Sequence, residues 1–84
     1  MKVSTNQYTH ELKIASEYFE ALKDGRKNFE IRKNARNFKV GEVISLREYN
    51  DNGEYTGNSI AKFISYMTTY KQKDNYVVLS IQDF

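Results

Sequence analysis

The sequence predicts a small, mostly β domain with one short helix (α+β), in which the strands form a closed barrel. Segments that alternate apolar and polar residues recur along the chain. One amphipathic helical segment stands among them, and most connections are short. About five or six strands with one helix are typical of a small barrel, because closure removes the exposed edges that such strands would otherwise present.

Length and composition indicate one domain. The 84 residues contain no internal repeat, low-complexity tract or Pro/Gly-rich linker, so residues 1–84 are expected to form a single unit, with 1–7 as a loose N-terminal segment. So short a chain buries only about 60–65% of its unfolded surface. The seven Tyr and five Phe help, because each aromatic side chain buries a large area.

Composition also limits the class of protein. The absence of Cys excludes disulfides and thiolate metal sites, and a single His without an acidic cluster argues against zinc, so we expect no metal and no cofactor. Residues Met1–Asn6 lack the apolar centre of a signal peptide, and no apolar run has the length needed to cross a bilayer. We therefore expect a cytoplasmic protein with no membrane partner.

The first two elements are a strand over His10–Ile14 and a helix over Glu17–Asp24. Ser16 is a favourable N-cap for that helix, and Gly25 is suited to the left-handed position that follows a helix end. The helix carries an apolar stripe formed by Tyr18, Phe19, Ala21 and Leu22.

A second strand is expected over Lys27–Lys33. Side chains alternate between the two faces of a strand, so Phe29 and Ile31 are predicted to face the core. Glu30 and Arg32 then lie next to each other on the opposite face. A carboxylate between cations is either a polar site or an ordinary solvated strand face.

The rest of the chain reads as β structure. Phe38 and Val40 are expected to return to the core after a polar connection, and Asn50–Gly53 has the composition of a hairpin turn. The last of the remaining strands is nearly continuous in apolar character and is expected to be central in the sheet. These strands are predicted over Val43–Tyr49, Ser59–Thr69 and Tyr76–Ile81.

Positive charge is concentrated in one part of the chain, although the net charge is only +2. Seven of the 13 basic residues lie close together, and the same stretch holds only two acids. Such a cluster serves either phosphate binding or solubility. Its members are Lys23, Arg26, Lys27, Arg32, Lys33, Arg36 and Lys39.

The spacing Gly25-x-Lys27-x-x-Glu30-x-Arg32 resembles the G-x-K-x-x-E-x-R signature of the ASCH domain, a member of the PUA-like superfamily. From His10 onward, nearly the whole chain resembles a small bacterial and phage ASCH-like family. The other matching segments are His10–Ile14, Tyr18–Phe19, Phe29–Asn34, Val40–Glu42, Leu46–Glu48, Gly53–Gly57 and Tyr76–Ile81.

This resemblance implies a PUA-like barrel that binds RNA or a nucleotide in a cleft between the helix and the barrel. Lys27 and Arg32 would meet phosphate or base edges there. Glu30 would orient Arg32 or accept a hydrogen bond from an exocyclic amine. The alternative is that Glu30 and Arg32 form an internal pair that closes the cleft without a ligand.

Further residues are candidates for the same ligand or RNA site. His10 belongs to the strand that opens the family's pattern, but taken alone it is a packing or surface histidine. Lys13 and Arg47 would add positive charge near the cleft or belong to a solvated face. Arg26 and Arg36 of the basic cluster are candidates for contact with the ligand. Several tyrosines are possible stacking platforms for bases, namely Tyr49, Tyr55, Tyr66, Tyr70 and Tyr76.

The resemblance leaves two functional classes. The first is a binding module without catalytic residues. The alternative is a small amidohydrolase acting on a modified nucleoside, since some ASCH-fold proteins use a Lys and a Thr nucleophile for that reaction. Lys27 matches the Lys, but Glu30 stands in place of the Thr. A carboxylate does not replace a hydroxyl nucleophile, although it is suited to act as a general base. A protein-interaction module has no positive support in the sequence.

Overall fold

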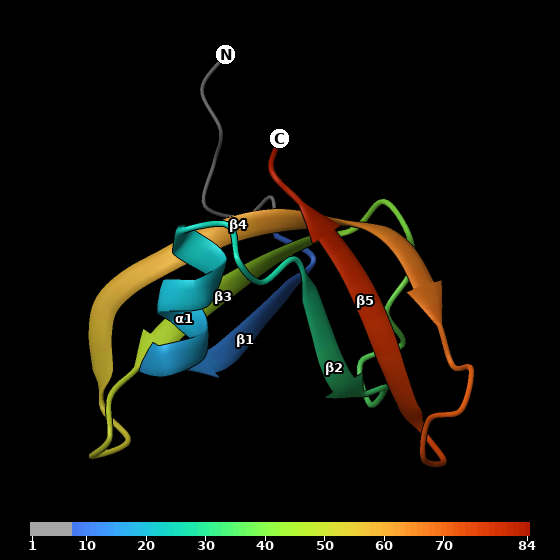
Figure 1. The fold of residues 1–84 in the computed structure, drawn as a ribbon, viewed down its shortest axis with the longest axis horizontal. Helices are drawn as coiled ribbons and strands as arrows, with labels where there is room; N and C mark the ends of the chain where they lie inside the picture. The colour runs from blue at the N-terminus through green and yellow to red at the C-terminus, as the bar shows by residue number, and fades with distance from the viewer. Residues whose placement is uncertain (1–7) are drawn as a thin grey trace.

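One helix and five strands make up the part of the chain that the computed structural model describes, residues 8–84 (Figure 1). The expectation for residues 1–7 lies outside the described residues. Over residues 8–84, no helix is both long and apolar enough to span a membrane. The elements are β1 (His10–Ala15), α1 (Ser16–Lys23), β2 (Phe29–Lys33), β3 (Val43–Tyr49), β4 (Tyr55–Thr68) and β5 (Tyr76–Gln82).

The five strands form one curled sheet in the order β1-β3-β4-β5-β2. The β1–β3 pair is parallel, and the other three pairs are antiparallel. The curl brings the two edge strands, β1 and β2, round to the same side of the molecule, next to α1 (Figure 1). The mostly β fold with one helix is therefore confirmed, but within residues 8–84 no backbone ladder joins β1 to β2. We call the gap between these two strands the seam.

The long strand β4 gives the sheet its curl. Its first part, through Phe63, pairs with β3, and its second part, from Phe63 onward, pairs with β5. The register of the second pairing shifts between Ile64 and Tyr66. An irregularity of this kind bends a strand and increases its twist, so one strand serves both halves of the sheet. Figure 1 shows β4 as an arch over the other elements.

A single apolar core fills the inside of the curl. α1 contributes Phe19 and Leu22 to it, so the helix covers part of the open side. Phe38 is buried as expected, whereas Val40 is exposed, because the chain turns at residues 39–42 and the strand-like alternation stops there. The core consists of Leu12, Ile14, Phe19, Leu22, Phe38, Ile44, Leu46, Ile64, Val77, Leu79 and Ile81.

The helix starts and ends one residue earlier than the sequence predicts, over Ser16–Lys23. The N-cap is Ala15 and not Ser16, so the prediction of Ser16 as N-cap is wrong: β1 runs directly into the helix, and alanine has no polar side chain to cap it. The Ser16 hydroxyl instead donates to the backbone carbonyl of Tyr49 at 3.1 Å and ties the helix to the end of β3. Gly25 has φ +84° and takes the expected left-handed position after the helix.

The prediction for the two faces of β2 is wrong. Phe29 and Ile31 were expected in the core, but they are 43% and 52% exposed. Glu30 is only 4% exposed and points inward. The alternation along the strand is therefore as predicted, with inside and outside exchanged.

Pairing with β5 explains the exchange. Residues directly opposite each other in an antiparallel pair share a face of the sheet. Glu30 lies opposite Leu79, and Arg32 lies opposite Val77. Leu79 and Val77 are fully buried, so β5 determines which face of β2 is inner. A charged pair is tolerated on that face because its charges compensate each other beside the seam.

Matched isoleucine substitutions test this assignment. Ile81→Ala removes a buried side chain from β5 and should lower the free energy of unfolding by about 2–5 kcal/mol. Ile31→Ala should lower it by less than about 1 kcal/mol, because that side chain is already half in water. Urea unfolding followed by circular dichroism measures both. Equal losses would show that Ile31 faces the core after all.

Candidate functional site

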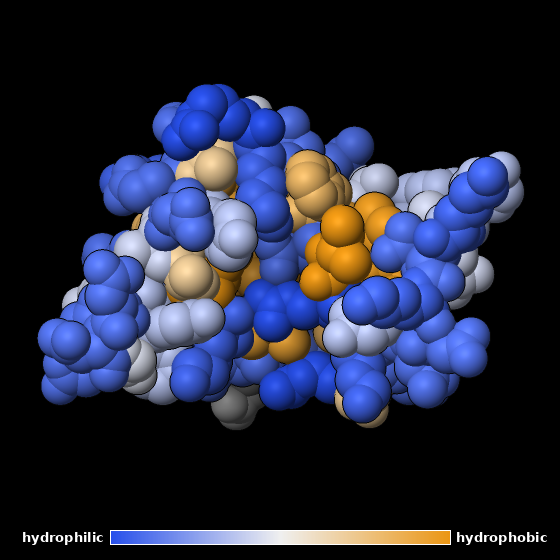
Figure 2. Space-filling model, turned by 60° about the horizontal axis from the view of Figure 1, so that its bottom comes forward, coloured by the Kyte–Doolittle hydropathy of each residue, from blue (hydrophilic) through white to orange (hydrophobic). Residues whose placement is uncertain are grey.

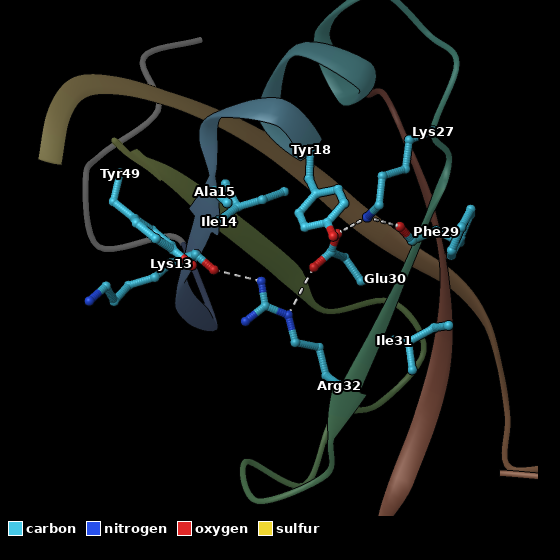
Figure 3. A pocket seen from close by; sticks show the side chains of 10 residues that line it. All are labelled: Lys13, Ile14, Ala15, Tyr18, Lys27, Phe29, Glu30, Ile31, Arg32 and Tyr49. Atoms are coloured by element: carbon cyan, nitrogen blue, oxygen red, sulfur yellow. Dashed lines mark hydrogen bonds and ion pairs between the residues drawn. The ribbon is translucent and has the colours of Figure 1, made fainter. Parts of the chain in front are cut away.

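A pocket of about 450 Å³ lies in the seam, where β1, β2, the end of β3 and α1 meet (Figure 3). We call it the seam pocket. Figure 2 looks toward the open underside of the curled sheet, where a hydrophobic patch lies directly beside strongly hydrophilic residues. The polar residues that line the seam pocket are Lys13, Tyr18, Lys27, Glu30, Arg32 and Tyr49.

The Glu30 carboxylate stands at the centre of the polar contacts. Its Oε1 accepts a hydrogen bond from Nε of Arg32 at 2.8 Å, and its Oε2 accepts one from Nζ of Lys27 (Figure 3). The carboxylate is almost fully buried, and both cations are partly buried. Charge-assisted hydrogen bonds in such surroundings are shorter and stronger than neutral ones. Each carboxylate oxygen is thus held by a different cation.

Arg32 also spans the seam. Its Nη2 donates to the backbone carbonyl of Lys13 at 2.7 Å, so the side chain joins β2 to β1 where the backbones do not meet (Figure 3). A guanidinium carries five N–H donors in a planar fork. The contacts to Glu30 and Lys13 use two of them within residues 8–84. Arg32 therefore keeps donor capacity for a ligand while it holds the seam.

Lys27 is positioned by the end of the helix. Its backbone N–H donates to the carbonyl of Ala21 at 3.0 Å, just after the left-handed turn at Gly25. Its Nζ donates to the carbonyl of Phe29 at 2.6 Å and lies 4.9 Å from the centre of that ring. The Tyr18 ring is 5.8 Å away. Contacts of this length allow cation–π attraction.

The Tyr49 ring lines the seam pocket next to Lys13, and Tyr55 lies just outside the lining. The Lys13 Nζ lies 5.1 Å from the centre of the Tyr49 ring and 5.8 Å from that of Tyr55. Arg47 stacks on Tyr55 with its guanidinium carbon 3.7 Å from the ring centre. Sequence reasoning named Tyr49 only as one of five tyrosines and placed Tyr18 in the apolar stripe of the helix. Tyr18 is half exposed and lines the seam pocket. The sequence pattern does not show that the helix lies beside β2, so this role of Tyr18 could not be predicted.

The predicted site residues separate into two groups. Lys13, Lys27, Glu30 and Arg32 come together in the seam pocket. Arg26 does not line it, and it forms an exposed ion pair with Asp24. Of the two cations between α1 and β2, Lys27 therefore lines the pocket and Arg26 does not.

Two further candidates lie elsewhere. His10 places Nε2 2.9 Å from Oε1 of Glu42, and its ring packs edge-on against Phe38 with centres 4.7 Å apart. Burial alone would raise the pKa of Glu42, but the His10 contact and the backbone N–H of Lys39 lower it overall. His10 therefore has a packing role outside the seam pocket. Arg36 lines a separate hollow of about 280 Å³, which Arg32 also lines.

The chemistry of the seam pocket favours binding of an anion that carries an aromatic ring. Three cations and one carboxylate line it, which leaves an excess of positive charge beside two tyrosine rings. No Ser, Thr, Cys or His is among its lining residues. Over residues 8–84, no group of three His, Cys, Asp or Glu side chains is placed to hold a metal ion.

Glu48 connects the end of β3 to the start of β4 through hydrogen bonds. It is a buried carboxylate next to Tyr49, and its Oε1 accepts hydrogen bonds from Thr56 at 2.8 Å and Asn58 at 3.0 Å. The Asn58 amide, together with neighbouring hydroxyl groups, holds the pKa of Glu48 below its usual value. This network fixes the start of the β3–β4 hairpin.

Removal of the central carboxylate should destabilise the fold. Glu30→Ala leaves two partly buried cations without their partner and should lower the free energy of unfolding by roughly 3 kcal/mol. Glu11→Ala is the matched control, because its ion pair with Arg47 is exposed and should contribute at most about 1 kcal/mol. Thermal and urea unfolding give both values. Similar losses in the two variants would contradict a buried role for Glu30.

The lowered pKa of Glu48 predicts a pH dependence. A carboxyl group with a lower pKa in the folded than in the unfolded chain stabilises fully above its unfolded value, here about 4.5. That contribution is lost as the pH falls through the folded value. Glu48→Gln should therefore be less stable than wild type at pH 7 and should show a smaller loss of stability below pH 4.5. Unchanged acid sensitivity in this variant would contradict the assignment.

The chain is similar to known proteins along most of its length. Residues 9–81 match the family described as Domain of unknown function (DUF3850), so the match includes every residue that lines the seam pocket. The "Uncharacterized 12.9 kDa protein in GpA 3'region" of Escherichia phage P2 is 32% identical over 71 residues, which are 83% of this chain. The chain spans 64% of the length of that relative. Because the family match runs over most of the sequence, this chain belongs to the DUF3850 family.

Proposed function

We propose that the protein binds RNA or a nucleotide in the seam pocket. One observation carries the proposal. Three cations, Lys13, Lys27 and Arg32, share a pocket with the rings of Tyr18 and Tyr49. Nucleotides combine a phosphate with a flat aromatic base, and proteins bind them through cationic groups and stacking rings.

The contacts within the pocket suggest how such a ligand would lie. Arg32 is held with its guanidinium plane across the seam and has unused donors for a phosphate or a base edge. Both oxygens of Glu30 already accept hydrogen bonds from Lys27 and Arg32, so its role would be to orient these cations. A base would then lie against the Tyr49 ring.

Resemblance to the ASCH domain and the PUA-like superfamily supports binding as the function. The alternative of an amidohydrolase has less support from the pocket. No Ser, Thr or Cys side chain is among its lining residues, and Glu30 is engaged by two cations that oppose its action as a base. We therefore propose a binding module for RNA or a nucleotide, without a metal or cofactor.

Titration with the four ribonucleoside monophosphates at low salt tests the proposal. At least one should bind, and Lys13→Ala should weaken it about tenfold, because a charge-assisted contact is worth roughly 1.5–3 kcal/mol. Lys73→Ala is the matched control, since this exposed lysine lies in the β4–β5 loop outside the pocket. Isothermal titration calorimetry measures the affinities.

The expected pattern is a loss of affinity in Lys13→Ala and none in Lys73→Ala. Melting curves should be nearly the same for both variants, because both side chains are exposed. If no monophosphate binds at high micromolar protein and short mixed RNAs also fail, the proposed function is wrong. Equal losses of affinity in the two variants would show that the overall charge of the protein, and not the seam pocket, attracts the ligand.

A further inference from the structure

A second hollow lies beside the seam pocket, and its charges are less balanced. It has a volume of about 280 Å³, and Arg32 and Lys13 line both spaces. Its other cations are Lys33 and Arg36, and its remaining lining residues are apolar. We call this space the basic hollow. No acidic residue lines it, in contrast to the seam pocket with Glu30.

Most of the charge in the basic hollow is uncompensated. Lys13, Lys33 and Arg36 form no ion pair within residues 8–84, which contain every Asp and Glu of the sequence. Of the four cations, Arg32 alone has a carboxylate partner, and that partner lies in the other pocket. Unpaired cations around a concave surface attract an anion and concentrate its field there.

The segment that carries Arg36 is held in place. Asn34 accepts a hydrogen bond from the backbone N–H of Phe38 at 2.9 Å, and its own N–H donates to the carbonyl of Asn75 at 2.6 Å. Phe38 is buried in the core and anchors the far end of the segment. The cations of the basic hollow are therefore presented from a fixed backbone.

Arg32 and Lys13 line both spaces. The Arg32 guanidinium crosses the seam from Glu30 to the Lys13 carbonyl, so a side chain that is held in place borders each hollow. A ligand that fills both spaces must pass along these two side chains and carry negative charge in each space. A single-stranded nucleic acid does so, because its phosphates recur at every nucleotide.

From this arrangement we propose that the basic hollow holds the phosphate and sugar of a neighbouring nucleotide, so that the ligand is a single-stranded RNA of at least two nucleotides. The inference rests on the proposed function and adds to it the size and kind of ligand. The volume of about 280 Å³ and the apolar side formed by Leu12, Ala35 and Phe38 exceed what a lone phosphate needs.

The test compares one ribonucleoside monophosphate that binds, its diphosphate, and a tetranucleotide of the same base, on the full chain at equal salt. The tetranucleotide should bind at least tenfold tighter than the monophosphate. Its logarithmic salt slope should be steeper by roughly 0.7 for each added phosphate contact. The double variant Lys33→Ala/Arg36→Ala should remove most of this gain and leave the affinity for the monophosphate unchanged, because neither residue lines the seam pocket.

The control variant Lys71→Ala/Lys73→Ala removes the same charge from an exposed loop and should keep the gain. Melting curves should be similar for both variants. The inference is overturned if the tetranucleotide binds no tighter than the monophosphate, if both double variants weaken it equally, or if the diphosphate shows the whole gain. If no nucleotide and no RNA binds, the proposed function is wrong as well. If the monophosphate binds but the tetranucleotide binds no tighter, only the inference about the basic hollow is wrong.

Discussion

The contacts across the seam depend on the buried carboxylate of Glu30. A carboxylate taken out of water carries a desolvation cost that only nearby cations and hydrogen bonds offset. Lys27 supplies one from the turn after the helix, and Arg32 supplies the other from the same strand. Three successive segments, namely the helix end, the turn and β2, must therefore keep one relative position. Pairing with β5 determines the inner face of β2, and the two cations compensate the charge that this pairing buries.

Arg32 connects this charge cluster to the topology of the sheet. The curled sheet ends at β1 and β2, and the guanidinium bridges the two edges through the carbonyl of Lys13. A closed backbone ladder would satisfy the edges but would leave no space between them. The side-chain bridge satisfies part of the edge and leaves room for the seam pocket. Stability and the proposed binding thus depend on the same guanidinium, and a ligand would add contacts to its free donors.

Local patterns were sufficient for most elements but not for their orientation. Val43–Tyr49 was predicted with its observed bounds, and the left-handed turn at Gly25 followed from composition. The inner face of β2 was predicted wrongly, because it depends on the pairing with β5. That pairing places Glu30 and Arg32 opposite the buried Leu79 and Val77, and the residues of β2 alone do not reveal it. Within the site, the proximity of Glu30 and Arg32 could be predicted from spacing. The contact between His10 and Glu42 could not, since 32 residues separate them and only the β1–β3 pairing brings them together.

A double-mutant cycle between Glu30 and Arg32 measures whether the buried ion pair holds the seam. Free energies of unfolding for Glu30→Gln, Arg32→Gln and the double variant give the coupling between the two side chains. Because the carboxylate is buried and accepts a hydrogen bond from the guanidinium at 2.8 Å, we predict a coupling of at least about 1.5 kcal/mol. The same cycle for the exposed Glu11–Arg47 pair should give less than about 1 kcal/mol. A coupling near zero between Glu30 and Arg32 would show that the seam is held without their charges, and the buried ion pair would then not be the constraint on which its contacts depend.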